Sequence, residues 1–205
     1  MGEGDRVFIY GGGGHGRVAA DTARRIGLRI EGFIDDDPSK GVSRETFLQK
    51  ARIERFSAAL GVGDNRARQA IAGFLQKEGA KIIALIDPSA IISPSAHIGE
   101  GAVVFPNAVI NDRARIEEGA IVNSGAIVEH DCVVGAYAHI APNAALAGGA
   151  KVGALAHIGI GASLTQNAIV GESAVIGAGA VVSGEIAPFA TAVGVPAREI
   201  AKTPF

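Results

Sequence analysis

A six-residue repeat fills the second half of the chain and constrains its fold more than any other feature. It begins at residue 86 and runs without insertion, and the first position of all 17 hexads, from Ile86 to Val182, is Ile, Val or Leu. The fifth position is Ala in 15 of the first 16 hexads and Cys132 in the remaining one, and the rule fails at Ile186. A period of six fits neither an α-helix nor a simple alternating strand.

Each hexad suits a short strand followed by a tight corner. The aliphatic side chain fills the interior, and only a small side chain fits where the chain turns. Glycine and asparagine at intermediate positions suit corners with positive φ, at Gly99, Asn107, Asn111, Gly153 and Gly171. Three hexads make a triangular coil of 18 residues, and 17 hexads predict between five and six coils, stacked about 4.8 Å apart. This pattern resembles the left-handed parallel β-helix of hexapeptide-repeat acyltransferases, although a purely structural solenoid carries the same repeat.

The first 85 residues show a different pattern, in which strands alternate with helices. The segments that suit strands are 6–10, 30–34, 58–63 and 81–86, and those that suit helices are 18–27 and 65–79. Alternation of this kind predicts a parallel sheet. We therefore expect an N-terminal α/β Rossmann-like partial domain at 1–85. An all-β left-handed parallel β-helix with a short C-terminal tail is expected at 86–205.

A glycine-rich loop follows the first expected strand. Gly11, Gly13 and Gly16 match the G-x-G-x-x-G pattern, in which amides at a helix start hold phosphate. Asp35 lies 19 residues after Gly16, where an acidic residue meets a ribose hydroxyl. The front domain has room for only one mononucleotide-binding half, so we expect a nucleotide with one attached group and not a dinucleotide. The alternative is that the glycines serve only tight packing of strand against helix.

Composition narrows the classes of function. The chain has 19 basic and 21 acidic residues, and neither part is basic enough to indicate nucleic-acid binding. The single cysteine excludes a disulfide framework within the chain and suits a reducing compartment. Charges, glycines or prolines interrupt every apolar run of about 18 residues, so no membrane span is expected. The N-terminal stretch lacks the pattern of a secretory signal, and we expect a cytoplasmic protein.

Five stretches of the chain together resemble one enzyme family. They are IYGGGGHGRV, FIDDD, GVGDNRAR, NSGAIVEHDCVVGAYAHIAPNA and VGVPA, and they span nearly the whole sequence. The chain is thereby similar to the hexapeptide-repeat nucleotide-sugar acetyltransferases, of the UDP-N-acetylbacillosamine N-acetyltransferase, GDP-perosamine N-acetyltransferase and sialic acid O-acetyltransferase type. The resemblance implies a homotrimer, acetyl-CoA between neighbouring β-helices, and a nucleotide-linked sugar held by the front domain.

The resemblance also implies roles for individual residues. His130 matches a general base and Asp131 the acidic neighbour that supports it, a position at which the family also carries Glu. The implied substrate-binding residues are Gly13, Gly14 and His15 in the nucleotide loop, Asp35 and Asp36 on the nucleoside side, and Gly63 on a third loop. The implied acetyl-CoA contacts are His139, Ile160 and Ala178, the last of which replaces a glycine of relatives.

The chemistry of acetyl transfer supports these roles. Attack on a thioester requires a neutral nucleophile, so a sugar ammonium must lose a proton, and a histidine beside a carboxylate suits that task. His130 is the third residue of its hexad, VEHDCV, and points away from the filled interior. We therefore expect an acetyl-CoA-dependent N-acetyltransferase that acts on the amine of a UDP- or GDP-linked 4-amino-6-deoxy sugar.

Three further residues bear on the reaction type and on metal binding. Cys132 takes the small interior position of its hexad, which favours direct transfer over an acyl-cysteine intermediate. His139 and His157 are one coil apart and are expected to stack in one column. The close histidine pair of the zinc-dependent β-helix enzymes is absent, so no metal is expected.

Three other functions stay open at this point. They are O-acetylation of a sugar of the sialic acid type, a nucleotide-sensing or scaffolding trimer without catalysis, and a zinc-dependent hydratase. The glycine loop and Asp35 favour a nucleotide-linked substrate over a free sialic acid. The adjacent His130 and Asp131 argue against a scaffold without catalysis.

Overall fold

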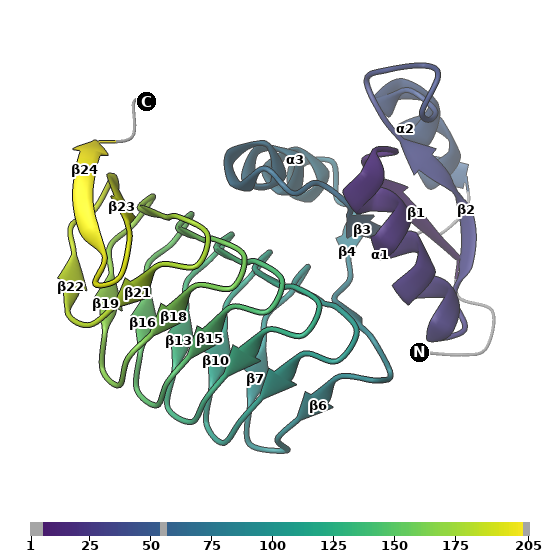
Figure 1. Ribbon diagram of the computed structural model, residues 1–205. Coiled ribbons are helices and arrows are strands. Elements are labelled where there is room, and N and C mark those ends of the chain that lie inside the picture. The colour runs from purple at the N-terminus through teal and green to yellow at the C-terminus, as the bar shows by residue number, and fades with distance from the viewer. Residues whose placement is uncertain (1–5, 54–56, 203–205) are drawn as a thin grey trace.

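The computed structural model describes residues 6–53 and 57–202, in which a small α/β front domain is joined to a three-sided β-solenoid (Figure 1). The front domain contains β1 (Arg6–Tyr10), α1 (Gly14–Arg25), β2 (Arg29–Ile34), α2 (Arg44–Ile53), β3 (Ser57–Leu60), α3 (Asn65–Lys77) and β4 (Lys81–Ile82). Its four strands form a parallel sheet in the order β2-β1-β3-β4. The expected parallel α/β domain is therefore confirmed.

The front domain differs from the sequence-based expectation in three places. Helix α2 was not expected, and α1 begins at Gly14, four residues earlier than predicted. The single strand predicted for 81–86 is two strands, β4 and β5 (Leu85–Ile86). The chain passes from one domain to the other within this apolar run, since β4 pairs with β3 and β5 pairs with a solenoid strand. The expected domain boundary at residue 85 falls inside β5.

The solenoid consists of strands that stack on three faces, and all except β23 and β24 at its C-terminal end are two residues long. Face 1 contains β5, β8 (Val103–Val104), β11 (Ile121–Val122), β14 (His139–Ile140), β17 (His157–Ile158), β20 (Val175–Ile176), β23 (Ala190–Val193) and β24 (Arg198–Lys202). Face 2 contains β6 (Ile91–Ile92), β9 (Val109–Ile110), β12 (Ile127–Val128), β15 (Ala145–Leu146), β18 (Ser163–Leu164) and β21 (Val181–Val182). Face 3 contains β7 (His97–Ile98), β10 (Arg115–Ile116), β13 (Val133–Val134), β16 (Lys151–Val152), β19 (Ile169–Val170) and β22 (Glu185–Ile186).

The register of these strands confirms the coil length that the hexads predict. Residue i pairs with residue i+18 in parallel from coil to coil, as His139 does with His157, and only the last coil is shorter. The second residue of each strand and the alanine at the fifth hexad position point inward and make one continuous core. This arrangement is the left-handed β-helix expected from the repeat.

Positive φ angles occur at the fourth position of the hexad, whereas most of the residues predicted to have positive φ lie at the second position. Asn107 has φ 59° as predicted, whereas Gly99, Asn111, Gly153 and Gly171 occupy second positions and do not have positive φ. At Gly153 an added Cβ would lie 2.5 Å from the backbone nitrogen of Glu172 in the next coil. The prediction for these four residues was wrong, and the three glycines instead permit close approach between coils.

An apolar layer joins the front domain to face 1. Alanines of α1, among them Ala19 and Ala23, share one buried cluster with Leu85, Val103 and Phe105 of the first coils. Burial of this kind stabilises a domain arrangement in proportion to the apolar area removed from water. The nucleotide loop before α1 is thereby held above face 1.

A buried arginine on α3 ties the same two parts together through hydrogen bonds. The side chain of Arg68 is fully buried, and burial lowers its pKa to about 10, so it stays protonated at neutral pH. Its Nε donates to the carbonyl of Gly119 at 2.7 Å and its Nη2 to that of Tyr137 at 2.7 Å, both on the solenoid. Its Nη1 donates to the carbonyls of Val62 and Gly63 in the front domain, at 3.0 and 3.1 Å.

We expect the substitution Arg68→Met to destabilise the protein by about 3 kcal/mol, because it leaves several buried carbonyl groups without a donor. Thermal unfolding followed by circular dichroism measures the effect, with Lys77→Met on the exposed side of the same helix as the control. A fall in melting temperature no larger than that of the control would contradict this account of the domain junction.

Candidate active site

His130 and Asp131 lie on the turn between β12 and β13, at the edge where faces 2 and 3 meet. The Nδ1 atom of His130 is 2.9 Å from Oδ2 of Asp131, and both side chains are exposed in the single chain. With the proton on Nδ1, the imidazole donates to the carboxylate and its Nε2 lone pair is free to accept a proton. This hydrogen bond, together with the guanidinium of Arg113, lowers the pKa of Asp131.

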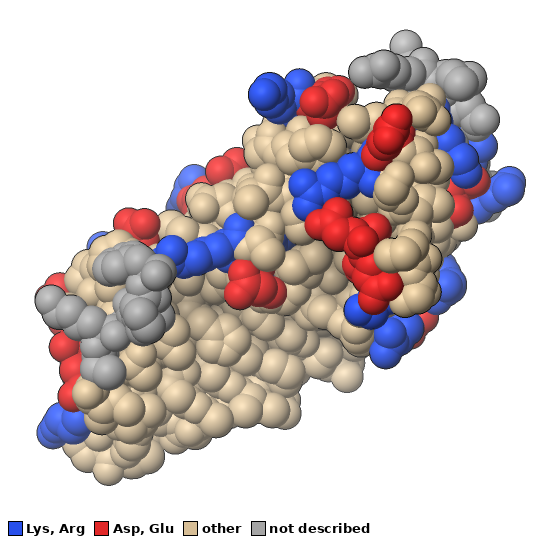
Figure 2. Space-filling view, turned by 90° about the horizontal axis from the view of Figure 1, so that it is seen from above, with Lys and Arg blue, Asp and Glu red and all other residues tan. Residues whose placement is uncertain are grey.

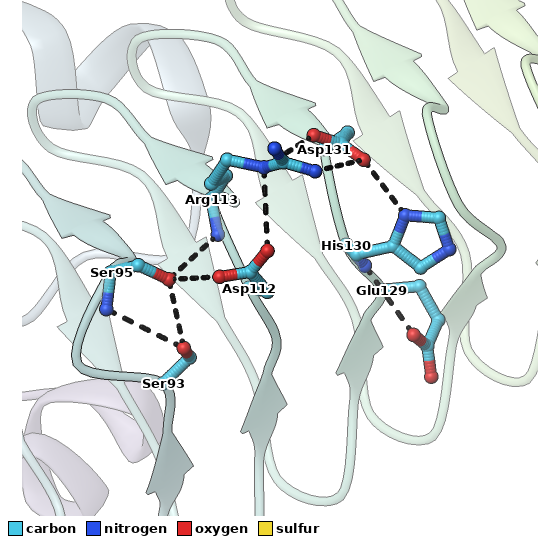
Figure 3. Close-up of polar contacts among 7 residues, drawn as sticks. All are labelled: Ser93, Ser95, Asp112, Arg113, Glu129, His130 and Asp131. Atoms are coloured by element: carbon cyan, nitrogen blue, oxygen red, sulfur yellow. Dashed lines mark hydrogen bonds and ion pairs between the residues drawn. The ribbon is translucent and has the colours of Figure 1, made fainter.

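Two residues that the sequence analysis did not single out lie next to this pair, and Figure 3 shows the first of them, Arg113. Arg113, one coil earlier, reaches Asp131 with Nε at 3.0 Å from Oδ1. Gly148, one coil later, leaves space for the imidazole, since a Cβ there would lie 2.6 Å from both Cε1 and Nε2 of His130. The 18-residue register explains both neighbours, because Arg113 lies one coil before Asp131 and Gly148 lies one coil after His130.

The nucleotide loop places its predicted residues at the start of α1. Gly13 is the N-cap residue of this helix and Gly14 its first residue, so unpaired backbone N–H groups face outward there. An added Cβ at Gly13 would meet no atom within 4 Å, which leaves the approach to the loop open. This geometry suits a phosphate group.

The two acidic residues expected on the nucleoside side already have partners. Asp35 accepts hydrogen bonds from the backbone N–H of Asp37 and of Gly12, at 2.9 and 2.8 Å, and these bonds lower its pKa. Asp36 is exposed and forms a two-pronged ion pair with Arg44. Asp35 therefore shapes the glycine loop, and its carboxylate oxygens keep further lone pairs for a ligand.

Three histidines form a column where the front domain meets face 1. The ring of His15 lies between Phe105, at a centroid distance of 5.1 Å, and His139, at 5.9 Å. His139 lies 5.0 Å from His157, so the predicted stacking of these two residues is confirmed. Burial is the main cause that lowers the pKa of His15 to about 4 and of His139 to about 3, and it also lowers the pKa of His157. The column is uncharged at neutral pH.

Asn123 completes this column. Its side-chain amide lies 2.9 Å from Nε2 of His139 and therefore orients that imidazole and not the imidazole of His130. Among the described residues, two buried atoms of the column have no hydrogen-bond partner, Nε2 of His15 and Nδ1 of His139, and both remain for a ligand.

Gly63 lines an open pocket of about 340 Å³ beside the histidine column. The pocket lies between the start of α3 and face 1, and its other lining residues include Asn65, His157 and Ser173. Gly63 therefore stands next to face 1, on the same side of the solenoid as the nucleotide loop.

Ile160 and Ala178 lie on the edge between faces 1 and 2, on turns of successive coils. They are stacked one above the other, since the N–H of Gly179 donates to the carbonyl of Ile160 at 2.9 Å. Ile160 is 55% exposed, and a ligand running along this edge would meet its side chain.

The predicted site residues thus form two groups within one chain. The front loops, the histidine column, Ile160 and Ala178 lie on face 1 or at its edge with face 2. His130 and Asp131 lie at the edge between faces 2 and 3, which is opposite to face 1 in a three-sided coil. A single chain does not bring the two groups together.

Cys132 has the position of a core residue. It is buried, its Sγ lies 3.2 Å from the carbonyl oxygen of Ala147, and burial raises the pKa of the thiol. Across residues 6–53 and 57–202, no three His, Cys, Asp or Glu side chains gather to hold a metal ion. Within the same residues, no helix is long and apolar enough to cross a bilayer.

Comparisons with known proteins agree with both halves of the structure. Residues 6–75 match the family model of the PglD N-terminal domain, and residues 113–148 match the bacterial transferase hexapeptide of six repeats. The UDP-N-acetylbacillosamine N-acetyltransferase of Bacillus subtilis (strain 168) is 37% identical over 112 residues. That match spans 48% of this chain and about half, 50%, of the length of the relative.

Two groups of solved structures match almost the whole chain. PerB from Caulobacter crescentus, crystallised with CoA and GDP-perosamine, is 36% identical with a TM-score of 0.92, over 95% of this chain and 97% of that chain. The acetyltransferase domain of PglB from Neisseria gonorrhoeae FA1090 is 36% identical with a TM-score of 0.89, over 95% of this chain and 99% of that chain. The chain belongs to the family of hexapeptide-repeat nucleotide-sugar acetyltransferases.

The neutral histidine column predicts a loss of stability in mild acid. In the unfolded chain a histidine binds a proton near pH 6.5, whereas folded His139 does so only near pH 3. The unfolded state therefore gains protons first, and the free energy of unfolding falls as pH drops below about 6.5, by about 1.4 kcal/mol per pH unit for each such residue. Urea unfolding at pH 7.5 and pH 5.0 measures this. The His139→Leu variant should lose less stability over that interval than the His97→Leu control, and equal losses would contradict the assignment.

Proposed function

We propose that this protein transfers the acetyl group of acetyl-CoA directly to the amine of a UDP- or GDP-linked 4-amino-6-deoxy sugar. The observation that carries this proposal is the His130–Asp131 pair, joined at 2.9 Å on an exposed edge of the β-helix. The relative PerB is described in complex with CoA and GDP-perosamine, and a PglB acetyltransferase domain with acetyl coenzyme A.

The proposed mechanism uses His130 as the general base. The sugar nitrogen attacks the thioester carbonyl carbon, and His130 Nε2 accepts a proton from that nitrogen. The tetrahedral intermediate collapses, the C–S bond breaks, and the CoA sulfur leaves as a thiolate that takes up a proton. Asp131 stabilises the imidazolium through the bond to Nδ1, as in other histidine–carboxylate pairs.

The position of Cys132 supports direct transfer. A covalent route would need an exposed, ionised thiol. The thiol of Cys132 is instead buried in the β-helix core with a raised pKa. The single cysteine also suits the reducing environment of the cytoplasm, which we propose as the location.

The front domain is the proposed site of the nucleotide. The amides at Gly13 and Gly14 suit the phosphates, Asp35 and Asp36 the nucleoside, and Gly63 and His15 the part of the substrate nearest face 1. His139, Ile160 and Ala178 are the proposed contacts of acetyl-CoA. No step of this mechanism requires a metal ion.

We propose a homotrimer with the active sites between subunits. The outward residues of face 2 carry no charge: Ile91, Val109, Ile127, Ala145, Ser163 and Val181. Charged side chains gather most densely over the front domain in the view of Figure 2. Packing of three copies through face 2 would place the His130 edge of one copy beside the Ile160 edge and front domain of the next.

Replacement of His130 by Ala tests the proposed base. We expect the kcat with the correct nucleotide-linked amine to fall about 10²–10⁴-fold, because general-base assistance is lost. The control is His97→Ala, an exposed histidine on face 3. Turnover near that of the unmodified protein would refute the assignment. A panel of UDP-, GDP- and dTDP-linked amino sugars and free sialic acid should show acetylation of an amine, and preference for sialic acid would favour O-acetylation.

Mixed assemblies test the shared site. His130→Ala removes the base, and Gly13→Tyr is designed to fill the open approach to the nucleotide loop, where an added Cβ meets no atom within 4 Å. Each variant alone should be inactive. Random mixing of the two in a symmetric trimer should restore about a quarter of the sites, because base and nucleotide loop come from different copies. If unfolded and reassembled mixtures stay inactive, the site lies within one chain.

A further inference from the structure

Asp131 is held from two sides, by His130 and by an arginine of the preceding coil (Figure 3). Nε of Arg113 lies 3.0 Å from Oδ1 of Asp131, and Nη2 donates to Oδ2 at 3.3 Å. Oδ2 is also the atom that contacts Nδ1 of His130 at 2.9 Å. The guanidinium therefore contacts both oxygens of the carboxylate, and it shares one of them with the imidazole. Paired contacts of this kind restrict orientation more than a single ion pair does.

The arginine is itself fixed by its own turn and by the coil before it. Oδ2 of Asp112 lies 3.3 Å from Nε of Arg113. The hydroxyl of Ser95 donates to the other oxygen of Asp112 and accepts the backbone N–H of Arg113 at 3.0 Å. A chain of polar contacts thus runs from Ser95 through Asp112 and Arg113 to the His130–Asp131 pair across three stacked turns.

Asp131 has little else to orient its carboxylate. Its side chain is 44% exposed, and its backbone adopts φ 59° at the corner of the coil. An aspartate has two rotatable side-chain bonds, and the short arm must keep Oδ2 directed at His130. The guanidinium supplies the missing restraint.

We propose that Arg113 is a positioning residue for the His130–Asp131 pair: its guanidinium orients the carboxylate toward the imidazole and offsets part of the carboxylate's charge. This inference rests on the proposed function in that it takes His130 as the base. It assigns Arg113 no contact with either substrate.

The charged groups that face His130 define what the arginine does electrostatically. On its own turn these are Asp131 and Glu129, whose Oε2 accepts the backbone N–H of His130 at 3.3 Å. The coil before supplies Arg113 and Asp112, and the coil after presents uncharged Gly148. Removal of the one cation from this set favours the protonated imidazole, so His130 should take up its proton at a higher pH.

Two substitutions separate orientation from charge. Arg113→Lys keeps the charge and loses the paired contact, whereas Arg113→Met loses both. The matched control is Arg115→Met, an exposed arginine two residues further along that pairs with Glu117 at 3.2 Å outside this network. All four proteins are compared as assembled full chains, after their melting temperatures show that they are folded.

We expect kcat to fall about tenfold in both Arg113 variants, with KM for both substrates unchanged, because misorientation affects the proton transfer and not binding. The acidic limb of the pH–rate profile in Arg113→Met should also lie about half a pH unit above that in Arg113→Lys, because only Arg113→Met loses the cation. A kcat and pH profile equal to those of Arg115→Met, with only the melting temperature lowered, would overturn the proposal and leave Arg113 a structural role.

A measurement without substrate keeps this test independent of the proposed function. The imidazole signals of His130, assigned by comparison with His130→Gln, are titrated by nuclear magnetic resonance in the intact assembly. The titration midpoint in Arg113→Met should lie about half a pH unit above that in Arg113→Lys, because both lose the paired contact and only the first loses the cation, and it should stay constant in Arg115→Met. Equal midpoints in Arg113→Met and Arg113→Lys overturn the inference even if the enzyme is active. A moved midpoint in a protein whose turnover does not need His130 would refute the proposed function alone.

Discussion

The buried guanidinium of Arg68 is the interaction on which the arrangement of the two domains depends. It donates to carbonyls of the front domain and of the solenoid at once, and a guanidinium presents five N–H donors on one side chain. A buried cation is costly to desolvate, so its main consequence is a defined orientation and not a large gain in stability. Because Arg68 donates to the carbonyl of Gly63 and Gly63 lies beside the ring of His15, the orientation set by Arg68 also places His15 against His139.

The repeat made the solenoid predictable, since each of its rules has a local cause. An aliphatic residue fills the interior, a small one fits the corner, and both recur at a fixed interval that the strand register reproduces. The conformation of the fourth position was not predictable from glycine content, because the coil holds even Tyr137 and Leu155 at positive φ. The run 81–86 was misjudged because its two halves pair with different sheets, and pairing partners are a tertiary property.

The residues of the candidate site also divide into those that the sequence could predict and those that it could not. The resemblance to the family pointed to His130, Asp131 and the front-loop residues, and in the structure a hydrogen bond joins the first two. Arg113 and Gly148 could have been predicted from the sequence, because residues 18 apart stack. Arg113 lies one coil before Asp131, and Gly148 lies one coil after His130. The contacts of Arg68 with Gly119 and Tyr137 follow no period and depend on how two domains dock. The sequence offers only a helical spacing, because Arg68 lies on the same side of α3 as Ala72 and Leu75, which the structure buries.

The separation of the two groups of site residues has a physical consequence for the proposed trimer. Face 2 is bounded by the edge that carries His130 and by the edge that carries Ile160, and its outward residues are uncharged. Removing those residues from water is the driving force for association. The same closure that hides face 2 would set the base of one copy against the nucleotide loop of another. Assembly of the trimer would then also complete the active site, because a lone subunit carries the two groups of site residues on opposite sides of its coil.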